Sequence, residues 1–377
     1  MKTSPSLLVL VLMSAAAVPA CGGGVSVSAG GTVDTGGSSV ALAFADTGGT
    51  GVAPAADPDV VVASGKRGEV DVLERVDDVS WRVFGSYFSG GETVQVAGGR
   101  VAGAGAVFVR NSDGEVALMP TQAGASHRLG FPVSIFHFIR NQVPTDASPP
   151  AAGFAVGDLD GDGSVDAAIA APGLGIVVLP GLAAAADPNV SAEHPPTING
   201  FKLAAGPSPS DLAIGDIDGD GRADIAALDA QTPTLRTYLT QSQAPLDIVA
   251  ASTLTLPAIG TAVRMTGCAS RPLVVTLADG RIVAVSPAGK IEPILGELSP
   301  VGPIAASGDA LAVESQRVTG MSLFDACAGS GAGLGLPVGI AAVAMTPADA
   351  TATRQLAVLQ PDGATVSLYV ARNANPR

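Results

Sequence analysis

Short runs in which apolar and polar residues alternate recur along the whole chain. Alternation with a period of two is typical of half-buried β-strands, and no helical periodicity is sustained after the first 20 residues. Pairs of such runs, separated by a turn, predict hairpins at seven places: 59–74, 106–120, 166–180, 224–239, 273–287, 310–325 and 356–370. The pattern therefore predicts an all-β protein.

Three of these hairpins turn at an Asp-Gly pair. The pairs are Asp113-Gly114, Asp279-Gly280 and Asp362-Gly363. Asp-Gly between β-rich runs is a strong hairpin signal, because a type I′ turn needs a positive φ at both central residues. We therefore expect type I′ turns at these three positions.

A further short apolar strand precedes most hairpins. These strands are predicted at 40–46, 93–99, 153–158, 211–216, 260–267, 303–308 and 339–345. Three or four strands per unit, repeated seven times, are the signature of β-propeller blades. A pair of β-sandwiches would explain the alternation but not the sevenfold recurrence. The predicted fold is a single β-propeller, with seven blades.

Two segments outside these units bear on how the ring is completed. Propellers often close by pairing N- and C-terminal strands in one blade, and residues 25–29 (VSVSA) could supply such a strand or belong to a tether. Residues 131–141 are expected to form the outer strand of the second blade, because the apolar side chains of Phe131, Ile135 and Phe138 need to be shielded from water.

Two of the predicted blades carry a cluster of aspartates between their first two strands. The spacing is D-x-D-x-D-G-x-x-D, with a residue at position 7 whose backbone carbonyl is the expected ligand. Two unit charges ~5 Å apart cost roughly 3 kcal/mol at an effective dielectric near 20, so an offsetting cation is expected. Hard oxygen ligands favour Ca²⁺, while solvated acidic turns without metal are the alternative. The candidate ligands are Asp158, Asp160, Asp162, Ser164 and Asp166 in one loop, and Asp216, Asp218, Asp220, Arg222 and Asp224 in the other.

These loops are not EF-hands, because their flanks are strands and position 12 holds Ile169 or Ala227 in place of a bidentate Glu. The segments "FAVGDLDGDGSVDAAIA" and "LAIGDIDGDGRADIAAL" resemble the FG-GAP or VCBS repeats of integrin-α-type propellers. The resemblance implies that each loop joins the first two strands of a blade and binds Ca²⁺. It covers two blades, and the other five rest on pattern alone.

The first blade holds what resembles a degenerate copy of this loop. Asp46 stands at its start, and Asp57 and Asp59 stand at its end. The interval between them lacks the middle carboxylates, so no strong metal site is predicted there.

The N-terminus predicts export. Lys2 precedes an apolar stretch at 7–18 that is too short to span a bilayer and fits a signal peptide over 1–20. The sequence "VPAC" resembles a lipoprotein lipobox, which implies lipidation of Cys21, and a plain secretory signal is the alternative. Residues 21–39 then form a Gly/Ser-rich tether to a propeller over 40–377. Because Gly22 follows the cysteine, resemblance to Gram-negative lipoproteins favours the outer membrane, facing the periplasm or the surface.

The charge composition argues against one class of binding partner. The chain has 34 acidic and 20 basic residues, a formal net charge of −14, and no basic run, which argues against nucleic-acid binding. In an exported protein, the pair Cys268 and Cys327 predicts a disulfide or two separate thiols.

No catalytic motif stands out. His127, His137 and His194 are scattered, and neither an H-E-x-x-H nor a G-x-S-x-G motif occurs in a suitable context. The predicted function is therefore a non-catalytic, lipid-anchored, calcium-binding module for a protein or glycan, acting as a monomer and touching the membrane through its anchor alone. The alternatives are an envelope-assembly scaffold and an enzyme with a site in the central channel.

Overall fold

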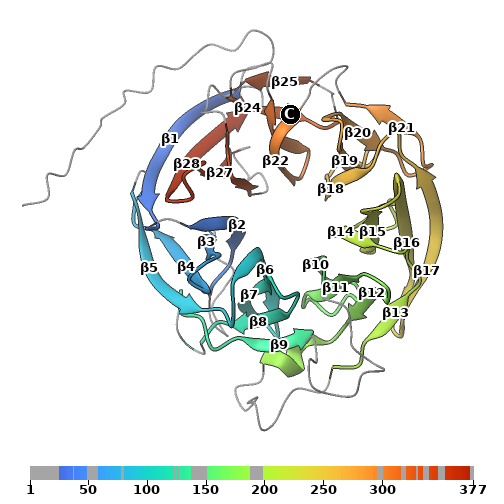
Figure 1. Ribbon diagram of the computed structural model, residues 1–377, viewed down its shortest axis with the longest axis horizontal. Coiled ribbons are helices and arrows are strands. Elements are labelled where there is room, and N and C mark those ends of the chain that lie inside the picture. Colours follow the sequence, from blue (N-terminus) through green and yellow to red (C-terminus); the bar gives the residue numbers. More distant parts are fainter. Residues whose placement is uncertain are drawn as a thin grey trace, which may run out of the picture.

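Seven four-stranded antiparallel sheets form a ring, as predicted (Figure 1). The computed structural model describes residues 25–36, 38–48, 58–77, 80–122, 124, 127–136, 151–186, 198–294, 300–315, 320–327, 330–333, 339–346 and 353–373. Blades 1 to 4 comprise β2 (Ser39–Ala45), β3 (Asp59–Ser64), β4 (Glu69–Arg75) and β5 (Trp81–Phe88); β6 (Thr93–Val101), β7 (Ala104–Asn111), β8 (Val116–Pro120) and β9 (Val133–Phe136); β10 (Gly153–Gly157), β11 (Asp166–Ala171), β12 (Gly175–Leu179) and β13 (Phe201–Leu203); β14 (Pro209–Gly215), β15 (Asp224–Asp229), β16 (Thr234–Gln243) and β17 (Leu246–Thr255). Blades 5 to 7 comprise β18 (Gly260–Met265), β19 (Leu273–Leu277), β20 (Ile282–Val285) and β21 (Ile291–Pro293); β22 (Pro300–Ser307), β23 (Ala310–Ser315), β24 (Gly320–Asp325) and β25 (Ser330–Gly333); β26 (Ala342–Met345), β27 (Thr353–Leu359), β28 (Thr365–Asn373) and β1 (Val25–Asp34).

The seventh blade closes the ring with strands from both ends of the chain. β1 pairs antiparallel with β28, from Val25 opposite Asn373 to Asp34 opposite Thr365, and the two lie side by side on the ring in Figure 1. The strand is longer than the candidate over 25–29, and it places the start of the propeller at Val25, upstream of residue 40. The predicted tether over 21–39 is therefore wrong for residues 25–34, because their backbone groups complete the last sheet. The predicted signal peptide and Cys21 lie outside the described residues.

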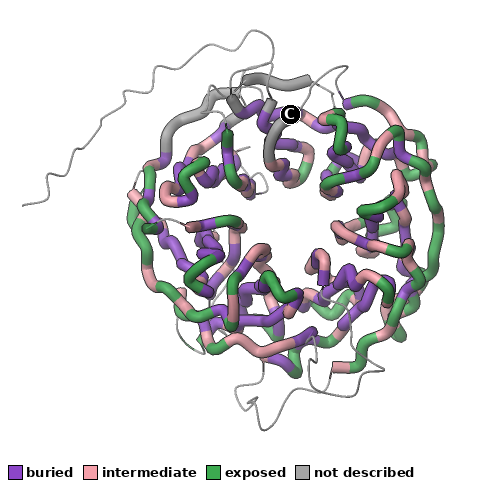
Figure 2. The backbone as a smooth tube through the Cα atoms, in the orientation of Figure 1, coloured by how far each residue is buried: buried purple, intermediate pink, exposed green. Residues whose placement is uncertain are grey.

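The hydrophobic core is divided among the seven junctions between neighbouring blades. Each of seven clusters of buried side chains takes members from two adjacent blades. The second and third strands of the blades supply most of them, and β3, β11 and β15 are buried at every position. Figure 2 shows this buried layer inside an outer rim that is partly exposed. Small Ala and Val side chains suit these strands because both of their faces are covered.

The outer strand of blade 2 lies within the predicted segment, but for a different reason. β9 covers Val133–Phe136, and Ile135 is buried as expected. The prediction that Phe131 is shielded from water is wrong, since this side chain is 88% exposed and the residue precedes the strand. Phe138 lies outside the described residues.

The Asp-Gly hairpins use a different turn from the one predicted. Gly114 has a φ of 87°, but Asp113 is not among the described non-glycine residues with positive φ. The N–H of Gly114 donates to the carbonyl of Asn111 at 2.9 Å, and Asp113 Oδ1 accepts from the N–H of Glu115 at 3.1 Å. The prediction of type I′ is therefore wrong: one residue in the left-handed region, after a type I turn, suffices for this loop length. Gly280 and Gly363 repeat the arrangement.

The described residues contain a single short 3₁₀ segment, Leu182–Ala186, and no α-helix. Among them, no helix has the length and apolar character needed to cross a bilayer.

Candidate metal centres

The two aspartate loops occupy the same place in blades 3 and 4. In blade 3 the last ladder pair of β10 and β11 joins Gly157 to Asp166. In blade 4 the corresponding pair of β14 and β15 joins Gly215 to Asp224. Each loop therefore connects the first two strands of its blade, and the ladder holds its final aspartate in a fixed position.

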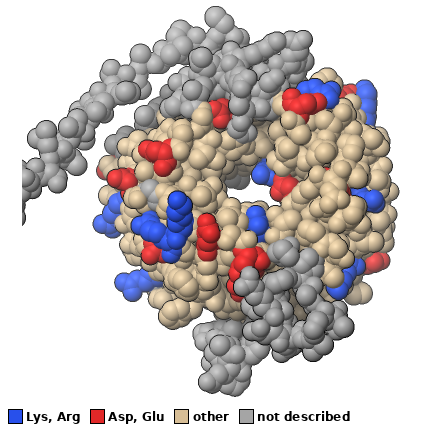
Figure 3. Space-filling model, viewed as in Figure 1, with Lys and Arg blue, Asp and Glu red and all other residues tan. Residues whose placement is uncertain are grey.

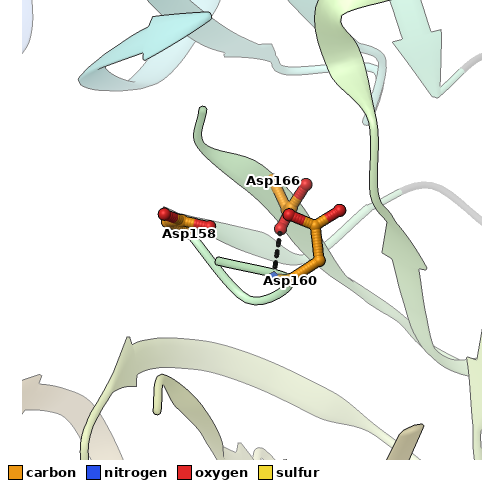
Figure 4. A group of neighbouring side chains, drawn as sticks. All are labelled: Asp158, Asp160 and Asp166. Atoms are coloured by element: carbon orange, nitrogen blue, oxygen red, sulfur yellow. Dashed lines mark hydrogen bonds between the residues drawn. The ribbon is translucent and has the colours of Figure 1, made fainter. Parts of the chain in front are cut away.

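Each loop brings three carboxylates together. One oxygen from each of Asp158, Asp160 and Asp166 lies within 4.8 Å of the others (Figure 4). Blade 4 repeats this grouping with Asp216, Asp218 and Asp224. These are the residues at positions 1, 3 and 9 of the predicted motif.

Backbone amides of the loop, together with that of Gly181 after β12, orient these carboxylates. Asp158 accepts hydrogen bonds from the N–H groups of Gly161, at 2.7 Å, and Gly163, at 3.0 Å. Both glycines have positive φ, 77° and 84°, which lets the chain curl around the carboxylate. Asp166 accepts from Leu159 N–H at 2.8 Å and from Gly181 N–H at 3.1 Å. The loop is thus held in shape by its own carboxylates.

The charge of the last aspartate is poorly solvated. Asp166 and Asp224 are fully buried. Burial raises the pKa of Asp166 to about 6, with a further contribution from the charge of Asp160. Burial likewise raises the pKa of Asp224, and the charges of Asp218 and Asp220 add to the effect. A bound cation would offset both desolvation and repulsion, so the donor set fits a divalent cation that prefers oxygen ligands.

The other predicted ligands are placed differently. Asp162 Oδ1 accepts from Ser164 N–H at 2.7 Å, and Asp220 Oδ1 accepts from Arg222 N–H at 2.9 Å. Neither aspartate belongs to the two groups of three. Ser164 Oγ accepts from the N–H of Ala102 in blade 2 at 3.1 Å. Ligation by Asp162, by Asp220 and by the carbonyls of Ser164 and Arg222 stays a prediction.

Arg222 also uses its side chain. Its guanidinium pairs with Asp220 and donates from Nε to the carbonyl of Thr240 at 2.7 Å. The hydrogen bond to Thr240 connects the loop of blade 4 to β16 of the same blade.

Two apolar loop residues, which the sequence motif does not mark, connect these loops to the next blade. Leu159 is fully buried and packs in the core between blades 3 and 4, beside Ile225 and Tyr238. Ile217, 5% exposed, packs in the core between blades 4 and 5. Their shared position 2, apolar in an acidic loop, was the available signal.

The equivalent loop of blade 5 carries a covalent link. Cys268, between β18 and β19, forms a disulfide with Cys327, which follows β24 of blade 6, and their Cα atoms are 5.4 Å apart. Of the three histidines, the described residues include only His127, in the loop between β8 and β9.

A channel of about 910 Å³ lies at the centre of the ring, and Figure 3 shows its opening. First strands from all seven blades line it, mostly with Ala, Val, Ile and Met side chains. An ion pair between Arg264 Nη1 and Asp211 Oδ2, at 2.7 Å, joins blades 4 and 5 at its wall.

Comparisons with known proteins bear on the fold. No model of a protein family matches this chain, and no curated protein matches it. Among solved structures, 821 chains match. Two of them are crystal structures of BBS1N in complex with ARL6DN, one soaked with lead and one with mercury. The first has a TM-score of 0.54 and 11% identity, covering 85% of this chain and 89% of that one. The second has a TM-score of 0.54 and 10% identity, covering 84% and 88%. At such identities the likeness establishes the propeller fold alone.

Proposed function

We propose that this protein is an exported, calcium-binding β-propeller that acts as a non-catalytic binding module for a protein or a glycan. The observation that carries the calcium assignment is the repeated grouping of three carboxylates at one ladder position in two blades. Asp158, Asp160 and Asp166 would hold one ion, and Asp216, Asp218 and Asp224 the other. The ion would supply positive charge beside the one buried carboxylate of each group, Asp166 or Asp224.

In this proposal calcium strengthens the attachment between blades. The loops hold Leu159 and Ile217 in the junctions that follow blades 3 and 4, so ordering each loop also orders a core contact. Other loops of the ring remain available for a partner. The apolar lining of the channel supports binding over catalysis, since the ion pair of Arg264 with Asp211 is its only described pair of opposite charges.

Thermal unfolding with calcium and with chelator tests the metal assignment. An ion that binds only the native state adds about 2.7 kcal/mol per site at a free concentration of 100 times Kd. Asp160→Asn and Asp218→Asn should each remove one of two sites, while Asp113→Asn, in a hairpin turn outside the groups, should remove neither. No metal by elemental analysis, together with no calcium-dependent change in Tm, would refute the assignment.

A protein partner is the more direct proposal, because the BBS1N propeller was crystallised in complex with another protein. Recovery of one defined partner on the immobilised monomeric protein, compared with and without calcium, tests whether the ion is regulatory. Equal recovery in both conditions would make calcium structural.

Lipidation of Cys21 and attachment to the bacterial outer membrane complete the proposal. Mass spectrometry of the mature N-terminus should find an acylated cysteine, and Cys21→Ser should release the protein from membranes. Protease accessibility in intact cells distinguishes a surface-facing binding module from a periplasmic scaffold, which would be protected.

A further inference from the structure

The loop between β2 and β3 in blade 1 is equivalent to the aspartate loops. Its last ladder pair joins Ala45 to Asp59, so Asp46 and Asp59 flank this loop as Asp158 and Asp166 flank the loop of blade 3. Blade 1 thus keeps the first and last carboxylates of the motif. Each of them pairs with a basic side chain of blade 2.

Asp46 is paired with an arginine. Arg100, on β6 of blade 2, places Nη1 against Asp46 Oδ2, and the N–H of Gly48 donates to Asp46 Oδ1 at 2.9 Å. The Asp46 side chain is 15% exposed and that of Arg100 is 23% exposed. A carboxylate this well covered is stabilised by a close positive charge.

Asp59 is paired with a histidine. It is 4% exposed, and its Oδ2 accepts from the hydroxyl of Thr47 and lies 2.6 Å from His127 Nδ1. Burial raises the pKa of Asp59, and the hydrogen bonds from Thr47 and His127 act in the opposite direction. The pairing therefore reduces the cost of placing a carboxylate inside the junction.

The backbone holds His127 in an unusual conformation. Its φ is +63°, a region that residues other than glycine rarely adopt. Its N–H donates to the carbonyl of Thr47 at 3.1 Å, and its carbonyl accepts from the hydroxyl of Tyr87 at 3.0 Å. Such an outlier persists only where surrounding contacts determine it, and here they direct the imidazole toward blade 1.

The second ring nitrogen also faces a carboxylate. His127 Nε2 is 3.7 Å from Glu74 Oε2 of β4, and Glu74 in turn pairs with Arg82 of β5. The ring of Phe84 lies 5.3 Å from the imidazole, between centroids. His127 is thus flanked by two acidic groups and an aromatic ring, all from blade 1.

We propose that Arg100 and His127 take, in blade 1, the place that a bound cation takes in blades 3 and 4, so that the junction between blades 1 and 2 closes without metal. The comparison with a bound cation rests on the calcium sites proposed above. Loss of calcium then loosens the loops of blades 3 and 4 and leaves the junction between blades 1 and 2 closed. A partner bound over those loops would respond to calcium, and one bound over that junction would not.

Hydrogen exchange read by mass spectrometry, on the full chain with calcium and with chelator, tests this proposal. In the wild type, chelation should speed exchange in 158–166 and 216–224 and leave 40–48 and 58–64 unchanged. Arg100→Met and His127→Asn should each speed exchange in 40–48 and 58–64 about tenfold in both conditions, the loss expected from one charged hydrogen bond. Asn tolerates the left-handed conformation, and Arg100→Met keeps the carbonyl that accepts from Val165 N–H at 2.8 Å.

Arg281→Met is the matched control, because Arg281 makes an exposed ion pair with Asp279 within one hairpin of blade 5. It should leave exchange in both segments of blade 1 unchanged. If Arg100→Met and His127→Asn exchange in blade 1 at the same rate as this control, the proposal is overturned. It is also overturned if chelation speeds exchange in 40–48 of the wild type as strongly as in 158–166.

The two proposals fail separately. If no segment responds to chelation while both variants still loosen blade 1, the calcium sites are wrong and the metal-free closure stands. Should Arg100→Met not fold, His127→Asn decides alone, since it changes a group nearer the surface.

Discussion

Blades 3 and 5 are both four-stranded antiparallel sheets, but they attach to their neighbours in different ways. The loop after the first strand of blade 3 carries carboxylates around a proposed calcium site and packs Leu159 in the next junction. The same loop in blade 5 carries Cys268, which is bonded to Cys327 of blade 6. Both blades nonetheless pack against the next one through equivalent apolar cores, between blades 3 and 4 and between blades 5 and 6. Strands and small apolar residues thus make the blade, while this loop sets how firmly the blade is attached to the next one.

The largest expected effect is at blade 5. Replacing Cys268 and Cys327 together by Ser opens a covalent loop with a sequence separation of 59 residues, which should cost about 4 kcal/mol of the free energy of unfolding. Denaturant unfolding of the double variant measures this loss, and its calcium response should equal that of the wild type. A loss of the calcium response would show that the two attachments are not independent.

The next effect is at blade 3. Leu159→Ala removes a fully buried side chain from the junction with blade 4 and should cost about 3 kcal/mol, in the range for such substitutions. Val249→Ala, at a position that is 41% exposed, is the matched control. If thermal unfolding shows equal losses for the two variants, the loop does not hold its neighbour through this contact.

A smaller effect concerns pH. The pKa of Asp166 is raised from 3.8 to about 6 in the folded, metal-free protein. Its contribution to stability is therefore fully present below about pH 3.8 and is lost as the pH rises through about 6. In chelator, the Tm of the wild type should fall relative to that of Asp166→Asn across this range.

Saturating calcium should reverse the sign of that difference, because the ion binds the deprotonated carboxylate. If the Tm of the wild type and that of Asp166→Asn change in parallel with pH in chelator, the assignment of this pKa is contradicted.

The smallest expected effect separates two positions within one loop. Asp162 lies outside the group of three formed by Asp158, Asp160 and Asp166, and an amide at position 162 can still accept from Ser164 N–H. Asp162→Asn should therefore weaken calcium binding less than Asp160→Asn, as measured by isothermal titration. A greater loss at 162 would place this side chain among the ligands.

Local signals predicted the blades with few errors. Alternating residues marked three strands in each of the seven units because each strand of a blade packs one or both faces against a neighbour. Details that depend on the tertiary surroundings of a residue were harder to predict. Phe131 is apolar yet 88% exposed, and the Asp-Gly turns place only the glycine at positive φ. Residues 25–29 read equally as strand or tether, since their partner β28 lies more than 300 residues away.

The repeat, the small apolar residues of the strands and the spacing of the aspartates can all be identified from the chain alone, because each is a local pattern with a local physical meaning. The folded ring was needed to show how the seventh blade closes and that Leu159 and Ile217 reach the next junction. It was also needed to show that Asp46 and Asp59 contact Arg100 and His127 of blade 2. These contacts join residues of different blades. Their geometry follows from the curvature of the whole ring, which no short stretch of sequence encodes.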